Sequence, residues 1–108
     1  MSKSQIPVIG MDVFAWNRAV LNKECTLPRD ARLLLCVLLR YAKRKTGVAF
    51  PSVAVLAKSM GVSARTARRA MVKLEERRIV RVVQPQVGRA NRYYLPLHPD
   101  AVATALTK

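Results

Sequence analysis

The sequence predicts one α+β domain, in which a core of three helices is followed by a C-terminal β-hairpin and preceded by a short helix. Three observations lead to this prediction. The chain has 108 residues, of which 51% are hydrophobic and 24% charged, enough for one core and too few for two. Apolar residues recur at helical spacing in three segments between residues 27 and 76. Two β-rich segments then follow, with a turn of Pro and Gly between them.

This organisation divides the chain into three parts. Residues 27–97 are expected to form the domain itself, residues 1–26 an N-terminal extension with a short helix, and residues 98–108 a tail with another. Residues 1–10 are expected to be irregular. Asp12 is a candidate N-cap for a helix that ends at Leu21. Its apolar positions are Val13, Trp16, Ala19 and Val20.

A longer helix is predicted to begin with Thr26 as N-cap and Pro28 just inside it, and to extend to about Arg44. Its apolar stripe consists of Ala31, Leu34, Leu35, Leu38 and Ala42. The opposite side is expected to be solvated and carries Arg29, Arg32, Arg40, Lys43 and Arg44. Leu33 and Cys36 lie among these basic residues. They require a cover, either residues 11–21 or a second subunit.

The central segment predicts a brief strand over residues 47–50 and then two helices joined by a tight turn. Ser52 is expected to cap the first helix, Gly61 to end it in a left-handed conformation, and Ser63 to cap the second. The apolar positions of the first helix are Val53, Leu56, Ala57 and Met60, and those of the second are Ala67, Ala70, Met71 and Leu74.

The C-terminal third predicts a hairpin and a last short helix. Residues 79–84 form one expected strand, residues 85–88 break it, and residues 91–97 return. Residues 99–106 are expected to form a helix that persists only if it docks. The aromatic residues Trp16, Tyr93 and Tyr94 are expected to pack in the core or the hairpin, with at most one of the two tyrosines facing inward.

The charge balance predicts a polyanionic partner. Lys and Arg number 20 against 6 Asp and Glu, which gives a net charge of +14. Residues 58–92 alone hold ten basic residues and only Glu75 and Glu76 as acids. Because the excess lies in the body of the domain, we expect it to form a binding surface for nucleic acid.

The second helix of the tight-turn pair fits the major groove of double-stranded DNA, which admits one helix. Its face opposite the apolar stripe carries Arg65, Arg69, Val72 and Glu76, flanked by Arg68 and Lys73. Arginine can pair with both acceptors of guanine, so Arg65, Arg68 and Arg69 are candidates for base contact. The candidates for contact with the DNA backbone are Ser52, Lys58, Ser63, Thr66, Lys73, Arg77, Arg78 and Arg81.

These residues resemble the winged helix-turn-helix of bacterial, plasmid and phage DNA-binding proteins over roughly residues 27–97. The matching motifs are Phe50-Pro51-Ser52, Leu56-Ala57, Met60-Gly61-Val62-Ser63, Arg65-Thr66, Leu74-Glu75 and Gly88-Arg89-Ala90-Asn91-Arg92-Tyr93. The resemblance implies that the hairpin is a wing, whose residues Arg89, Asn91 and Arg92 lie along the minor groove or the phosphates. It also implies a role as a transcriptional regulator, or in replication or maintenance of a plasmid or phage. The family often has Gly where this chain has Arg77-Arg78.

The sequence favours a binding module over an enzyme. It has six acidic residues and one histidine, His98, at no spacing typical of a catalytic or metal site. We therefore expect no enzymatic activity, no cofactor and no metal. Cys25 and Cys36 make no disulfide framework and no segment resembles a membrane span, so a reducing cytoplasm is the expected location. The resemblance implies that this is the cytoplasm or nucleoid of a bacterium.

Several alternatives stay open at this point. One is a nucleoid-like protein that coats DNA without sequence preference, since the high charge also suits that role. A second is an RNA-binding winged helix, and a third is a module for protein interaction. A homodimer on a palindromic or repeated site is also open, because nothing in the sequence shows which surface would pair.

Overall fold

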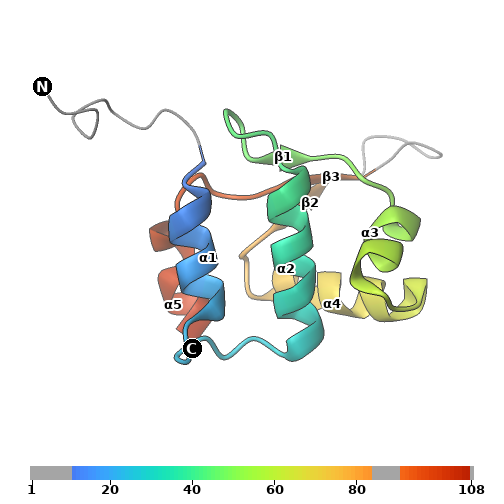
Figure 1. Cartoon of the computed structure of the whole chain (residues 1–108), viewed down its shortest axis with the longest axis horizontal. Helices are drawn as coiled ribbons and strands as arrows, with labels where there is room; N and C mark the ends of the chain where they lie inside the picture. The colour runs from blue at the N-terminus through green and yellow to red at the C-terminus, as the bar shows by residue number, and fades with distance from the viewer. Residues whose placement is uncertain (1–10, 84–90, 108) are drawn as a thin grey trace, which may run out of the picture.

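A computed structural model describes residues 11–83 and 91–107 of the chain, and these form an α+β winged helix-turn-helix (Figure 1). The predicted fold class is therefore confirmed. The elements in chain order are α1 (Val13–Leu21), α2 (Arg29–Tyr41), β1 (Val48–Ala49), α3 (Val53–Met60), α4 (Ala64–Glu76), β2 (Arg81–Val83), β3 (Arg92–Tyr94), the 3₁₀ helix η2 (Pro99–Val102) and α5 (Ala103–Thr107).

The three strands form a small antiparallel sheet in the order β1-β3-β2. The predicted hairpin is present, with Val82 opposite Tyr93. The brief strand β1 pairs with the other edge of β3, where Ala49 lies opposite Tyr93. This pairing joins residues more than forty positions apart in the chain, so no local pattern could predict it. It fixes the base of the wing to the segment that enters α3.

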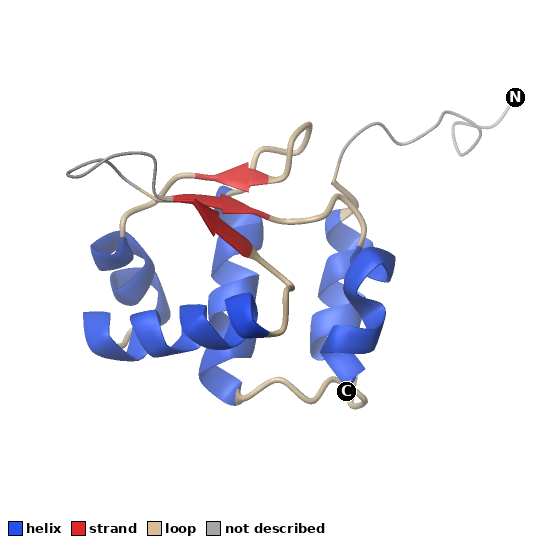
Figure 2. Ribbon diagram, turned by 180° about the vertical axis from the view of Figure 1, so that it is seen from behind, coloured by secondary structure: helices blue, strands red, loops and turns tan. Residues whose placement is uncertain are grey.

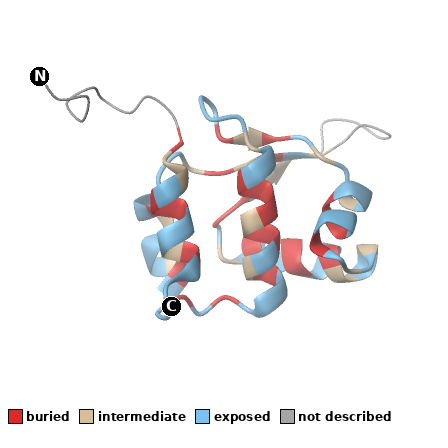
Figure 3. Cartoon of the chain, in the orientation of Figure 1, coloured by how far each residue is buried: buried red, intermediate tan, exposed pale blue. Residues whose placement is uncertain are grey.

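The hydrophobic core lies between the helices and one face of the sheet (Figures 2 and 3). Helices α2, α3 and α4 pack against one another beneath the sheet. Tyr93 is fully buried and Tyr94 is only partly buried, as the alternation along a strand predicts. Trp16 is also fully buried, and its indole nitrogen donates a hydrogen bond to the Pro96 carbonyl at 2.9 Å. Among the residues that the structure describes, the largest fully buried side chains are Trp16, Val20, Leu34, Leu35, Leu38, Leu56, Leu74, Ile79, Val80, Tyr93 and Leu106.

The predicted cap at Thr26 is wrong. Pro28 occupies the N-cap position of α2 and no side chain caps the helix. Thr26 instead binds the C-terminal helix, because its backbone N–H donates to the Leu106 carbonyl at 2.8 Å. Its hydroxyl accepts a hydrogen bond from Arg77 at 3.1 Å. Thr26 therefore links the loop before α2 to α5 and to the end of α4. The expected C-terminal helix is present as η2 and α5, and it docks beside α1 (Figure 1).

Helix α2 ends at Tyr41, three residues before the predicted end. Ala42 adopts an extended conformation, and the backbone N–H of Lys43 donates to Val48 at 2.9 Å. Gly47, with φ of 72°, closes this turn by donating to the Lys43 carbonyl at 2.7 Å. The turn directs the chain into β1. The pairing of β1 with the sheet is therefore favoured over the longer helix α2 that the sequence predicts.

The basic side of α2 is not uniformly solvated, contrary to expectation. Arg32 is half-buried and donates hydrogen bonds to the carbonyls of Cys25 at 2.8 Å and Leu27 at 3.4 Å. These two hydrogen bonds stabilise the loop between α1 and α2. Cys36 is half-buried beside α1, which supplies the expected cover, whereas Leu33 stays 38% exposed. Burial raises the pKa of the Cys36 thiol.

The two strands of the hairpin are shorter than predicted. Ile79 and Val80 form a buried bend rather than strand, because their backbone N–H groups turn back to the Leu74 carbonyl at the end of α4. Arg78 enters this bend with φ of 58°, a left-handed conformation that favours Gly. Gln84 and the predicted turn at residues 85–88 lie outside the described residues. After Tyr94, Leu95 leaves the strand but still donates to the Gly47 carbonyl at 2.9 Å.

Replacing Arg78 by Gly is expected to raise the free energy of unfolding by up to about 1 kcal/mol, because Gly adopts the left-handed conformation without strain. The Arg78 side chain is exposed, so little packing is lost. Urea denaturation measures the effect. Arg77→Gly is the matched control: Arg77 has φ of −82° and binds Thr26, so this change should destabilise. A loss of stability in both variants would contradict the assignment of strain to Arg78.

Candidate nucleic-acid interface

Helices α3 and α4 form a helix–turn–helix with the caps that the sequence predicts. The Ser52 hydroxyl accepts a hydrogen bond from the Val55 N–H at 3.2 Å, and Ser63 does the same for Thr66 at 3.1 Å. Gly61 ends α3 in the left-handed conformation with φ of 73°. Only Gly61, Val62 and Ser63 separate the two helices. The short turn packs α3 against α4 and leaves the outer face of α4 uncovered (Figure 2).

Helix α4 has two chemically different faces. Ala67, Ala70, Met71 and Leu74 are buried against the core. The exposed residues are Arg65, Arg68, Arg69, Val72, Lys73, Glu75 and Glu76. Within the described part of the chain, no carboxylate lies at ion-pair distance from any of the cations of α4. The two glutamates lie in the last turn, so the first two turns present three arginines and no acidic residue of the same helix.

The hydroxyl groups proposed for phosphate contact are partly engaged within the protein. Ser63 accepts from the Thr66 N–H and donates to the Thr66 hydroxyl at 3.1 Å. The Thr66 hydroxyl therefore keeps its own proton for an outside acceptor. Ser52 caps α3 and is exposed. Thr66, Arg69 and Lys73 share a groove with the start of α2, where Asp30 also lies.

The wing is described in part. Arg92 is exposed on β3, at the base of the hairpin. Asn91 is half-buried, and its amide donates to the Tyr93 hydroxyl at 3.4 Å. Burial raises the pKa of the Tyr93 hydroxyl, while this hydrogen bond lowers it to a smaller extent. Asn91 thus has a structural partner. Arg89 lies outside the described residues.

The remaining predicted backbone contacts lie on α3, at the C-terminal end of α4 and on β2. Lys58 is exposed on α3. Arg81 lies over the ring of Tyr94, 5.3 Å from its centroid. Arg77 and Arg78 line a hollow with η2 and α5 at the C-terminal end of α4, and Arg77 is also bound to Thr26. The sequence could not show this placement, because the docking of α5 depends on contacts distant in the chain.

Two exposed apolar residues near this interface were not among the predicted site residues. Val72 is 50% exposed in the middle of the outer face of α4, where helical spacing already places it. Phe50 is 44% exposed between β1 and α3. Continuing the in–out alternation of β1 by one residue predicts that Phe50 points outward. Its neighbours Lys43 and Arg92 come from the turn after α2 and from β3, which the alternation does not predict.

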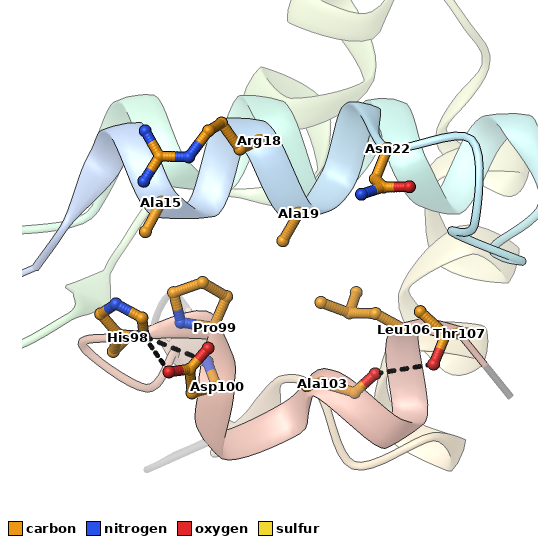
Figure 4. Close-up of a pocket in the computed structure, with 10 residues that line it drawn as sticks. All are labelled: Ala15, Arg18, Ala19, Asn22, His98, Pro99, Asp100, Ala103, Leu106 and Thr107. Carbon is orange, nitrogen blue, oxygen red and sulfur yellow. Dashed lines mark hydrogen bonds and ion pairs between the residues drawn. The ribbon is translucent and has the colours of Figure 1, made fainter.

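A second hollow, of about 260 Å³, lies between α1 and the C-terminal helices (Figure 4). Small apolar side chains face one another across it, and His98 stands at one end, 3.4 Å from Asp100. This hollow and the first turn of α4 are at opposite ends of the molecule (Figure 1). Within residues 11–83 and 91–107, no three His, Cys, Asp or Glu side chains come together to hold a metal ion. None of the described helices has the length and apolar character needed to cross a membrane.

Residues 26–80 match the protein family described as helix-turn-helix domain. The chain belongs to this family. The match covers just over half of the sequence and includes α2, β1, α3 and α4. No curated protein and no solved structure matches the chain. Membership of the helix-turn-helix family supports DNA as the partner, and domains of this kind are typically not enzymes.

Proposed function

We propose that the protein binds double-stranded DNA with sequence preference, through α4 in the major groove and the wing beside it. One observation supports this most strongly. The outer face of α4 presents Arg65, Arg68 and Arg69, all exposed and without a carboxylate at ion-pair distance in the described part of the chain. Three arginines on the first two turns of a helix repel one another, and phosphate or guanine acceptors relieve that repulsion.

In this proposal residues 27–97 form the DNA-binding unit. Arg65 and Arg69, with Arg68 beside them, contact base edges. Thr66 and Lys73 contact phosphates, and Lys58 adds charge from α3. Ser52 and Ser63 act through the helix N-termini that they cap, which favour anions. Arg92 contacts the backbone from the wing, together with Arg89 and Asn91. Arg81 adds charge at the wing's base, while Arg77 and Arg78 reach only phosphates that flank the site.

The biological role in this proposal is control of transcription, or replication or maintenance of a bacterial plasmid or phage. It rests on the resemblance of residues 27–97 to regulators and initiators of that kind. The place of action would be the bacterial cytoplasm or nucleoid. Two copies on a palindromic or repeated site would double the number of base contacts.

A competition experiment between DNA and RNA duplexes tests which kind of nucleic acid the protein binds. A labelled DNA duplex is bound and then displaced by unlabelled DNA or RNA duplexes of the same sequence and length. The proposal predicts that RNA competes at least tenfold less well, because the deep, narrow major groove of A-form RNA does not admit a helix. Equal competition by RNA at all salt concentrations would contradict it and would indicate charge-driven binding alone.

A further inference from the structure

The face of the sheet that points away from the helices has a composition of its own. Along β3 the buried Tyr93 separates Arg92 and Tyr94, which therefore point outward. The strand register places Arg81 beside Tyr94 on the same face. Continuing the β1–β3 register by one residue brings Phe50 opposite Arg92. This outward side is the upper surface of the sheet in Figure 2.

Cations and aromatic rings alternate across this surface. The Lys43 ammonium lies 5.4 Å and the Arg92 guanidinium 5.8 Å from the centre of the Phe50 ring. The Arg81 guanidinium lies 5.3 Å from the centre of the Tyr94 ring. These are cation–π distances. We call the surface formed by Lys43, Phe50, Arg81, Arg92 and Tyr94 the aromatic–cation face.

The charge of the aromatic–cation face is not balanced within the protein. The six acidic residues of the chain are Asp12, Glu24, Asp30, Glu75, Glu76 and Asp100. Five of them lie on or next to α1, α2, α4 and η2, Glu24 lies in the loop between α1 and α2, and none is on the sheet. Among the described residues, no carboxylate is at ion-pair distance from the three cations of the face. A polyanion is therefore the complementary partner.

The aromatic rings of this face favour one kind of polyanion over another. In a duplex the faces of the bases are stacked on one another, so a duplex offers this surface only phosphates. A single strand offers both phosphates and free base faces, and base–aromatic stacking contributes to its binding. Phe50 is 44% exposed, although an apolar ring of that size is normally covered. Its exposure between two cations fits a partner that supplies both groups.

We propose that the aromatic–cation face binds single-stranded DNA, with bases stacked on Phe50 and Tyr94 and phosphates held by Lys43, Arg81 and Arg92. This activity goes beyond the proposed duplex recognition by α4. It shares Arg81 and Arg92 with the wing of that proposal, whereas Lys43, Phe50 and Tyr94 have no part in it. The two surfaces are carried by different elements, the outer side of the sheet and the outer side of α4 (Figure 2).

The test compares two labelled probes by fluorescence anisotropy on the full chain: a 12-nucleotide oligothymidylate, and an abasic oligomer with the same number of phosphates. We expect the oligothymidylate to bind at least fivefold more tightly. Phe50→Leu should lower the affinity for the oligothymidylate about fivefold to tenfold, since one stacked base contributes roughly 1 kcal/mol or more. The same variant should bind the abasic oligomer as tightly as the unchanged protein does. Lys43→Gln should weaken both probes.

Phe14→Leu is the matched control, because Phe14 is a 79% exposed phenylalanine that lies on α1 and is not part of the aromatic–cation face. It should change neither probe. Thermal melting of each variant checks that the fold is intact. Equal binding of the two probes, or loss of oligothymidylate binding in Arg65→Ala but not in Phe50→Leu, would overturn the proposal. Both outcomes leave duplex recognition untouched, since that is measured with duplex probes.

Discussion

Replacing Arg69 by alanine is expected to weaken binding to the preferred DNA duplex by roughly 10- to 100-fold, and to reduce the preference for that duplex over a scrambled one. Arg69 is exposed on the second turn of α4, and an arginine paired with a guanine contributes about 1–3 kcal/mol of discrimination. The measurement is the dissociation constant for each duplex at one salt concentration. The ratio of the two constants reports the contribution of base contacts, because the charge contribution is the same for both duplexes.

Lys58→Ala provides the control for this prediction. Lys58 is also exposed and cationic, but it lies on the supporting helix α3. Its removal should weaken both duplexes equally and only slightly, and it should lower the salt dependence by about one phosphate contact. If Arg69→Ala and Lys58→Ala caused the same loss on both duplexes, Arg69 would be a phosphate contact and not a base contact.

Replacing Gly47 by alanine is expected to lower the free energy of unfolding by roughly 2–5 kcal/mol, which combines left-handed strain with overpacking. Gly47 has φ of 72°, and a Cβ at this position would overlap the Leu95 carbonyl oxygen. The same backbone joins β1 to β3 through the hydrogen bond from Leu95 to Gly47. The substitution should therefore loosen the base of the wing as well, and urea denaturation measures the total effect.

Gly61→Ala separates the effect of left-handed backbone strain from the effect of overpacking. Gly61 has φ of 73°, almost the same as Gly47, but nothing lies within 4 Å of an added Cβ. This variant should lose only about 1 kcal/mol, the cost of the left-handed conformation. If both alanine variants lost the same amount, the close approach of Leu95 would not contribute to stability.

The elements that the sequence predicts well are those whose signals are local. Asp12, Ser52 and Ser63 each cap the expected helix, because an N-cap acts on N–H groups two or three residues away. The left-handed end of α3 at Gly61 has the same local cause. Helical spacing likewise gives the buried and exposed faces of α4.

The features that the sequence does not predict depend on residues far apart in the chain. Thr26 was expected to cap α2 but binds Leu106 and Arg77 instead. Arg32 was expected to be solvated but holds the loop at Cys25. Each of these contacts requires the packing of α1, α4 or α5, which periodicity cannot supply.

The distinction between local signals and contacts distant in the chain also applies to the candidate interface. The basic face of α4 follows from spacing within one helix. The aromatic–cation face combines Lys43 from the turn between α2 and β1, Phe50 from the position directly after β1 and Arg92 from β3. Only the pairing of β1 with β3 brings these residues together, so their common chemistry is not visible in the sequence.

The central claim, that α4 recognises a DNA sequence, is tested most directly by selection from a library of random duplexes. The enriched and scrambled duplexes are then bound at several salt concentrations. The claim predicts one enriched motif that keeps a large advantage in affinity as salt rises, since base contacts are less sensitive to salt than phosphate contacts. Absence of a motif, with an equally steep salt dependence for every duplex, would contradict it and would identify a protein that coats DNA through its net charge of +14.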